Sequence, residues 1–266
     1  TAYYQTKVCL PAREAGRTLW WHFDGVDYQC EAYVNGQLVG CHEGFFASFE
    51  FDISTAVCTW DNTFTLVVKN DFSHNGNSSP LYDNIAYEGN KMYAATGPGF
   101  DDPYSGWHHC PAGMGILSPS YIEERATAFL SDVHVRPLAE KGEYEIWAEI
   151  FNTDFRPIPD VSLAISVYGR NFADTVLENF SYVPVTFAES GSKEVVTQAD
   201  LQNASLQSKK RPLVFYAGAN MVRLRLEMDG DIRLWTPDGP NLYEVQVTLK
   251  SGDTVLDTAS SSFGMR

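Results

Sequence analysis

The sequence has few cysteines and no pattern that would use them as a framework. Five cysteines occur among 266 residues, and no two of them form a Cys-x-x-Cys pair. A complete set of disulfides needs an even number of cysteines, and structural zinc sites use closely spaced cysteine and histidine pairs. We therefore predict buried free thiols rather than a domain held together by disulfides or zinc.

Basic charge is also scarce. Lysine and arginine number 19 against 34 aspartate and glutamate residues, which gives a formal net charge of -15. Such a surface repels phosphate backbones and anionic lipid headgroups, so we expect neither nucleic acid nor a membrane as a partner. An acidic chain with 14% aromatic residues is compatible with neutral ligands such as sugars.

Long hydrophobic runs are absent. No stretch approaches the ~18 apolar residues that a membrane-spanning helix needs. The first residues, Thr1 to Tyr4, show neither the basic nor the apolar region of a signal peptide. The sequence leaves cytoplasmic and secreted locations both open.

Helical periodicity is nearly absent, and strand patterns dominate. The one plausible helical turn covers residues 198–203. Because strands and helices do not alternate, we do not expect a parallel α/β catalytic core in this chain. Aromatic, β-branched or alternating residues predict strands at 18–23, 31–34, 37–40, 49–53, 64–69, 120–123, 128–135, 144–150, 161–167, 221–226 and 242–249.

Two local signals predict a hairpin and a domain boundary. Asn35-Gly36 separates two strand segments, and a type I′ hairpin turn needs positive φ at both central residues. Arg136 and Pro137 precede a polar stretch, and proline removes a donor from a sheet. Short strands with turn residues on both sides of this point predict two β-sandwiches, residues 1–136 and 137–266.

The segment from residue 70 to about residue 115 interrupts the strand pattern. It is rich in glycine, proline, asparagine, aspartate and serine, and loops of this length are usually functional or disordered. Its aromatic residues favour order, because disordered segments are normally poor in them. These aromatic residues are Tyr82, Tyr87, Tyr93, Phe100, Tyr104 and Trp107.

The residues around the predicted hairpin resemble a known family. They resemble the sugar-binding jelly roll of glycoside hydrolase family 2, whose members read roughly F-x-G-V, then V-x-[VL]-N-G-x-x-[VL]-G-x-H-x-G, then F-x-F-D-I. Residues 107–116 resemble the later aromatic and Gly-x-Gly-Ile stretch, although Leu117 stands where a tryptophan commonly follows. The matching hairpin residues are Asn35, Gly36, Gly40, His42, Gly44, Phe49, Phe51 and Asp52.

The second half of the chain resembles the same family. Residues 234–245 are similar to the W-x-P-x-x-P-x-L-Y motif near the end of its immunoglobulin-like domain. Residues 263–266 are similar to the F-G-[FM]-R string that leads into the catalytic barrel. The resemblance therefore implies a jelly-roll sandwich, without its first strand or two, followed by an immunoglobulin-like sandwich.

The resemblance implies a glycosidase whose chemistry lies outside this chain. Family members are retaining β-glycosidases that act on β-galactosides, β-glucuronides or β-mannosides, and retention needs two carboxyl groups ~5–5.5 Å apart. Both are glutamates of a barrel that would begin after Arg266, and a whole barrel needs ~250 residues of its own. We therefore assign no catalytic residue, metal or cofactor here. The expected partners are a β-glycoside and the barrel of the same polypeptide, and oligomerisation of the whole enzyme stays open.

Asp101, Asp102 and Trp107 are the candidate substrate-binding residues. In family members the corresponding loop can reach the sugar pocket of the barrel. A carboxylate accepts hydrogen bonds from sugar hydroxyls, and an aromatic face covers the apolar side of a pyranose. The alternative is an Asp-Asp-Pro turn beside a buried tryptophan.

Two histidine-containing motifs favour structural roles. Neighbouring residues of a strand point to opposite faces, so one metal ion cannot easily use both His108 and His109. His42 and Glu43 could be taken for an acid–base pair, but their place in the jelly-roll pattern favours an imidazole that bonds backbone in a turn.

These patterns favour the non-catalytic N-terminal region of a family 2 glycosidase, which would buttress and partly line the active site. The rival interpretation is a stand-alone carbohydrate-binding or adhesive module of two sandwiches. The sequence after Arg266 distinguishes them. A glucuronide site needs cations, and this chain is acidic. We therefore expect the substrate of the enzyme to carry a neutral sugar, with a β-galactoside as the first choice.

Overall fold

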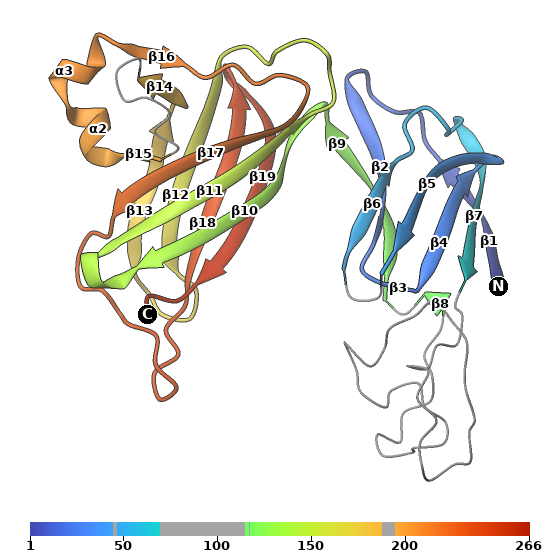
Figure 1. Ribbon diagram of the computed structural model, residues 1–266, viewed down its shortest axis with the longest axis horizontal. Helices are drawn as coiled ribbons and strands as arrows, with labels where there is room; N and C mark the ends of the chain where they lie inside the picture. Colours follow the sequence, from blue (N-terminus) through green and yellow to red (C-terminus); the bar gives the residue numbers. More distant parts are fainter. Residues whose placement is uncertain (45–46, 70–114, 117, 188–194) are drawn as a thin grey trace, which may run out of the picture. The chain divides into compact units, whose positions relative to one another are not determined.

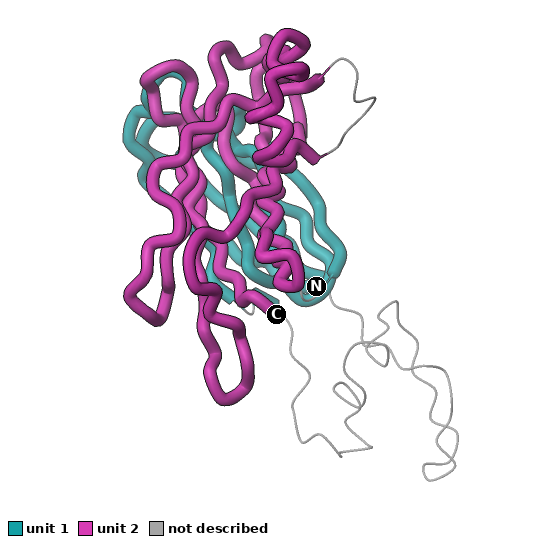
Figure 2. The backbone as a smooth tube through the Cα atoms, turned by 90° about the vertical axis from the view of Figure 1, so that its left-hand side faces the viewer, with its two compact units in different colours: residues 1–124 teal, residues 125–266 magenta. Residues whose placement is uncertain are grey.

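The structure, a computed structural model, describes residues 1–44, 47–69, 115–116, 118–187 and 195–266 (Figure 1). It divides into two compact units, residues 1–124 and 125–266, which we call unit 1 and unit 2 (Figure 2). Strands form most of the described part of both units, with three short helical segments beside them. The predicted all-β fold is therefore confirmed.

Unit 1 is a sandwich of short antiparallel strands. One sheet has the order β1-β7-β4-β5, a second has the order β6-β2-β9, and β3 pairs with β8. The strands are β1 (Ala2–Leu10), β2 (Arg17–Phe23), β3 (Val26–Asp27), β4 (Gln29–Val34), β5 (Gln37–Glu43), β6 (Phe49–Asp52), β7 (Trp60–Lys69), β8 (Gly115–Ile116) and β9 (Ser120–Ala126).

The predicted hairpin joins β4 and β5. Asn35 and Gly36 have φ values of 52° and 81°, so both central residues adopt the left-handed backbone that a type I′ turn needs. Val34 then pairs with Gln37, and the pairing reaches Gln29 and Glu43 after a register shift between Tyr33 and Ala32. The Asn-Gly turn and this irregularity together set which side chains of β5 face the core.

Aromatic rings fill the core of unit 1. Phe23 stacks on Phe49 with ring centroids 4.9 Å apart, and Trp21 meets Phe64 edge to face. Ring pairs of this kind add to the stabilisation from buried apolar area. Because alternate residues of β2, β4 and β7 point inward, the core collects Phe23, Cys30, Ala32, Val34, Phe64, Leu66 and Val68, each at most 2% exposed.

Unit 2 is a second sandwich with the sheet orders β10-β11-β17-β15 and β13-β12-β18-β19. Its long strands pair antiparallel, and the short strand β15 pairs with β17 in parallel. Its core draws alternate residues from both sheets, including Ile146, Ile165 and Val247. Its elements are β10 (Ala128–Leu138), η1 (Ala139–Lys141), β11 (Glu143–Asn152), β12 (Val161–Gly169), β13 (Thr175–Tyr182), β14 (Val185–Phe187), β15 (Val196–Thr197), α2 (Gln198–Gln202), α3 (Ala204–Gln207), β16 (Lys210–Pro212), β17 (Gly218–Glu227), β18 (Tyr243–Ser251) and β19 (Thr254–Phe263).

The residues Arg136 and Pro137, where the sequence suggests a boundary between residues 1–136 and 137–266, lie within β10. The compact units divide earlier, between Glu124 and Arg125. Pro137 is compatible with the strand because β10 is an edge strand of its sheet, where a missing backbone donor breaks no inner ladder.

The prediction of buried free thiols is correct for Cys30 and wrong for Cys9, Cys41 and Cys58, which are exposed. Cys9 and Cys41 lie on the edge strands β1 and β5, and Cys58 lies in the turn before β7. In strands the side chains alternate between the two faces, so a thiol one residue out of phase with the core is exposed.

Gly40 of β5 allows the two sheets of unit 1 to approach. A Cβ atom at this position would lie 2.1 Å from Cδ1 of Phe51 in β6. The Phe51 ring therefore packs directly against the backbone of β5 at Gly40. Gly40 itself pairs with Ala32 of β4.

We predict that Gly40→Ala lowers the free energy of unfolding by about 1–3 kcal/mol, because the added methyl group forces the Phe51 ring to move. Gly239→Ala is the matched control, since its Cβ would meet no atom nearer than 3.4 Å. Calorimetric unfolding of both variants checks this. Equal stability of Gly40→Ala and the unaltered chain would show that the ring has room to move.

Candidate functional site

The predicted substrate-binding residues Asp101, Asp102 and Trp107 lie outside the described residues, as do His108, His109 and Cys110. The described residues on either side of this segment pair with neighbouring parts of unit 1. Lys69, at the end of β7, pairs with Gln29, and Gly115 of β8 pairs with Asp27. Both flanks are therefore attached to the same short stretch of chain, where β3 leads into β4.

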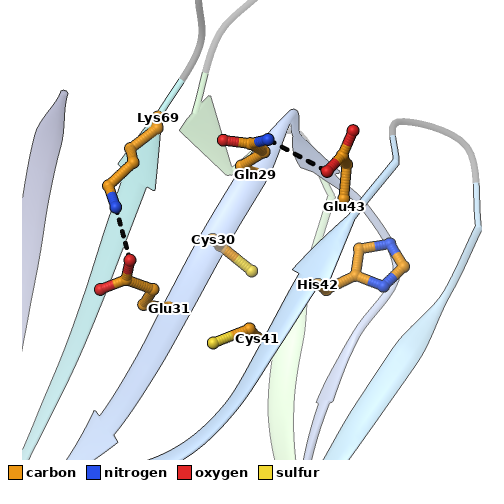
Figure 3. Close-up of a pocket in the computed structure, with 7 residues that line it drawn as sticks. All are labelled: Gln29, Cys30, Glu31, Cys41, His42, Glu43 and Lys69. Atoms are coloured by element: carbon orange, nitrogen blue, oxygen red, sulfur yellow. Dashed lines mark hydrogen bonds and ion pairs between the residues drawn. The ribbon is translucent and has the colours of Figure 1, made fainter. Parts of the chain in front are cut away.

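A hollow of about 350 Å³ lies at this end of unit 1 (Figure 3). Its lining comes from three neighbouring strands, β4, β5 and β7. The sequence predicted the hairpin that supplies most of this lining, but it did not predict the hollow, because Lys69 joins it only through the pairing of β7 with β4. The lining residues are Gln29, Cys30, Glu31, Cys41, His42, Glu43 and Lys69.

Charged and polar groups of the hollow pair across the strands. Lys69 donates a hydrogen bond of 2.5 Å to Oε1 of Glu31, and Tyr33 donates one of 2.8 Å to Oε2. Gln29 donates to Oε2 of Glu43 at 3.0 Å. Figure 3 shows both cross-strand pairs among the lining residues.

These contacts determine what Glu31 can do chemically. The hydrogen bonds from Lys69 and Tyr33 hold the pKa of the Glu31 carboxyl below its ordinary value, and the same contact raises the pKa of Lys69. A general acid of a glycosidase needs a raised pKa instead. Glu31 therefore suits acceptance of hydrogen bonds from hydroxyl groups and does not suit proton donation.

His42 has a structural role, although not through the predicted bond to backbone. Its ring stacks on Phe49 with the centroids 3.8 Å apart and the planes 12° apart. Nε2 is buried and meets no hydrogen-bonding partner among the described residues. Burial lowers the pKa of His42, against an opposing effect of Glu43, so the neutral ring is favoured.

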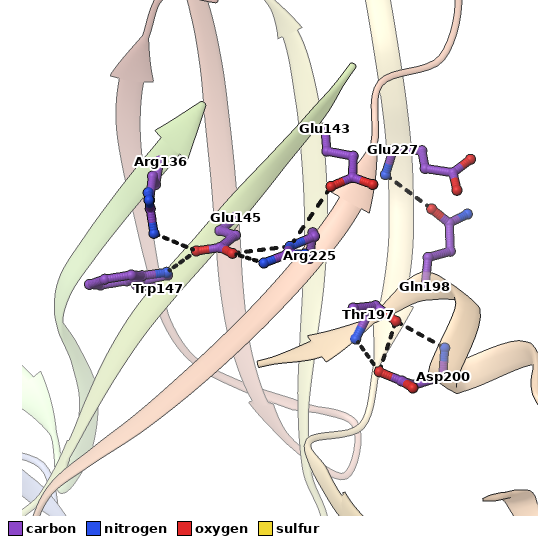
Figure 4. A network of polar contacts seen from close by, with 9 residues as sticks. All are labelled: Arg136, Glu143, Glu145, Trp147, Thr197, Gln198, Asp200, Arg225 and Glu227. Carbon is purple, nitrogen blue, oxygen red and sulfur yellow. Dashed lines mark hydrogen bonds and ion pairs between the residues drawn. The ribbon is translucent and has the colours of Figure 1, made fainter. Parts of the chain in front are cut away.

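Unit 2 carries a polar network on the outer face of its first sheet (Figure 4). Glu145 of β11 is only 2% exposed, although its neighbours on this face are more accessible. Arg225 of β17 donates to it from Nε at 3.0 Å and Nη2 at 2.5 Å, and the indole of Trp147 donates at 3.1 Å. Arg136 of β10 approaches within 3.8 Å.

This network connects three strands and stabilises the sheet. Burial alone would raise the pKa of Glu145, but the hydrogen bonds from Arg225 and Trp147 hold it below its ordinary value. A buried carboxylate with such partners is already satisfied, so it is a structural group rather than a free ligand site. Nearby, Thr197 and Asp200 form a capping box that starts α2 (Figure 4).

A metal site finds no support in the described part of the chain. No group of three or more histidine, cysteine, aspartate or glutamate side chains there could hold an ion. Within the same residues, no helix is long and apolar enough to cross a membrane.

The described residues thus form two all-β units, with a hollow lined by polar and charged side chains at one end of unit 1. Comparison with known proteins gives its family. The model "Glycosyl hydrolases family 2, sugar binding domain" matches residues 1–97, and "Glycosyl hydrolases family 2" matches residues 128–266. The chain belongs to glycosyl hydrolase family 2.

Relatives and solved structures agree with this assignment. The chain is 21% identical over 266 residues to a β-galactosidase of Thermoanaerobacter pseudethanolicus and 22% identical over 249 residues to one of Priestia megaterium. The two alignments include 100% and 92% of this chain, respectively. The chain spans only 28% and 18% of the length of those relatives. A crystal structure of a Bacteroides uniformis β-glucuronidase shares the fold, with a TM-score of 0.64, 15% identity, and coverage of 99% of this chain and 26% of that one.

We predict that the unit 1 fold loses stability below pH 6.5 through His42. Because its pKa in the folded state is lowered from the ordinary 6.5, the unfolded state binds the proton more readily. This contribution to stability is complete above pH 6.5 and falls as the pH decreases towards the folded-state pKa.

The variant His42→Phe tests this. It keeps the ring stack on Phe49 and removes the buried Nε2, so at pH 8 it should equal or exceed the parent chain by about 1 kcal/mol. Urea unfolding between pH 8 and pH 5 should show a smaller loss of stability for the variant. Parallel losses in both proteins would exclude His42 as the cause.

Proposed function

We propose that the chain is the non-catalytic N-terminal region of a retaining β-glycosidase, with β-galactosidase as the first choice. One observation carries the proposal: the chain is matched over all or nearly all of its length, while it spans 28% and 18% of the two β-galactosidases. Two successive family domains account for its length, one in each unit. The barrel that performs the hydrolysis would be supplied by the same polypeptide.

In the whole enzyme, unit 1 would contribute to the sugar pocket through Asp101, Asp102 and Trp107. The positions of Lys69 and Gly115, which flank this segment, support the proposal, because both residues pair with strands at one end of unit 1. The hollow at that end adds acceptors and donors that match sugar hydroxyls. Unit 2 would act as an immunoglobulin-like spacer that helps to buttress the active site of the barrel.

A neutral sugar suits the charge of the chain better than an acidic one. With a net charge of -15, the chain offers few cations to a uronate carboxylate, whereas hydroxyl groups need none. A β-galactoside is therefore the proposed substrate class of the whole enzyme.

The coding sequence downstream of Arg266 tests this function most simply. We expect it to encode a (β/α)₈ barrel with an Asn-Glu dipeptide at a strand end. A stop codon directly after Arg266 would instead support the rival function, a carbohydrate-binding or adhesive module.

We predict that Asp102→Asn in the full-length enzyme lowers kcat/KM for a nitrophenyl β-galactoside by about 10- to 100-fold, the usual worth of one hydrogen bond to a charged group. Asp160→Asn is the control, since Asp160 is an exposed residue of unit 2. Steady-state kinetics of the two variants check this. An unchanged kcat/KM for Asp102→Asn would remove that carboxylate from the site.

A further inference from the structure

Trp60 combines high exposure with an unfavourable backbone conformation. The residue is 63% exposed at the start of β7, and its φ is 78°. For a bulky residue this left-handed conformation costs about 1–2 kcal/mol and is an outlier that suggests a functional reason. Glycine would adopt it freely.

A buried amide holds this turn in place. Asn62, 2% exposed, accepts hydrogen bonds at Oδ1 from the backbone N–H of Cys58 (2.7 Å) and from Nδ2 of Asn35 (2.9 Å). Its Nδ2 donates to the backbone oxygens of Cys58 (2.7 Å) and Trp60 (3.1 Å). All four hydrogen-bonding positions of the amide are used, so the turn that presents Trp60 is rigid.

A second hollow, of about 250 Å³, adjoins this turn. Thr59 precedes Trp60 in the chain, and Leu10 pairs with Trp60 in the sheet; both line the hollow. The full lining is Leu10, Pro11, Ala12, Arg13, Leu19, Ser54, Val57, Cys58 and Thr59.

Donor groups line this hollow. Arg13 donates to the backbone oxygen of Ser54 at 3.3 Å and forms no ion pair within the described residues. The Ser54 hydroxyl accepts a hydrogen bond from the N–H of Leu19, which leaves its proton for another acceptor. Guanidinium and hydroxyl donors match the hydroxyl groups of a pyranose, and the exposed indole on the adjoining turn matches its apolar face.

We propose that Trp60 and the hollow beside it form a carbohydrate-binding site. One face of a sugar ring stacks on the indole, while Arg13, Ser54 and Thr59 hydrogen-bond to its hydroxyl groups. A preorganised turn keeps the entropic cost of binding low, which gives a functional reason for the strained backbone of Trp60.

This site is separate from the hollow near Lys69. Trp60 and Lys69 are the first and last residues of the 10-residue strand β7, so roughly 30 Å of extended chain lies between them. The site would hold a polysaccharide at a distance from the reacting bond, a role that goes beyond the proposed function and needs no catalytic barrel.

Affinity electrophoresis of the 266-residue chain in gels containing β-1,4-galactan, xylan or glucomannan tests the proposal. At least one polysaccharide should retard the parent chain. Trp60→Gly should bind at least ~10-fold more weakly, because an aromatic anchor is lost. It should also unfold at the same or a higher temperature, because glycine relieves the strain. Arg13→Gln should weaken binding several-fold.

Phe155→Ala is the matched control, because Phe155 is a 94% exposed aromatic residue of unit 2. This variant should bind like the parent chain. The proposal is overturned if no polysaccharide retards the parent chain, or if Trp60→Gly binds within twofold of it. Equal losses in Phe155→Ala and Trp60→Gly would also overturn it, by showing that any exposed aromatic ring gives the retardation.

Discussion

The amide of Asn62 is the contact on which the arrangement of unit 1 depends. It lies buried at the beginning of β7, the strand that pairs with both β1 and β4. Through Asn35 it connects this beginning to the β4–β5 hairpin, and through Cys58 and Trp60 it closes the turn before β7. A buried amide with every position satisfied favours one register over its alternatives, because a shifted strand would leave these groups unpaired.

Strand β7 then connects two chemically different ends of unit 1. At its start, a strained turn presents Trp60 beside donor groups. At its end, Lys69 pairs with Glu31 beside the hollow from which the chain leads to Asp101 and Asp102. The proposed division of roles follows: the end at Lys69 faces the reacting sugar of the whole enzyme, and the end at Trp60 holds a more distant part of the ligand. In unit 2, the charge network around Glu145 connects neighbouring strands of one sheet.

Local patterns predicted much of this fold, because strands and tight turns depend on neighbouring residues. The Asn35-Gly36 turn has the positive φ values expected of it. The two hollows were not predictable, since strand pairing brings Lys69 to Glu31 and Leu10 to Trp60 from distant parts of the chain. For His42, the motif indicated a structural role but not the ring stack on Phe49, which depends on how β5 and β6 pack.

We propose that these two sandwiches bind sugar and buttress the active site of the barrel but do not cleave glycosidic bonds themselves. Hydrolysis of nitrophenyl β-galactoside by the purified 266-residue chain, measured beside the full-length polypeptide, tests it most directly. We expect no release of nitrophenol above the buffer rate from the chain, and turnover from the longer polypeptide. Release by the chain alone at an enzyme-like rate, retained after further purification, would contradict it.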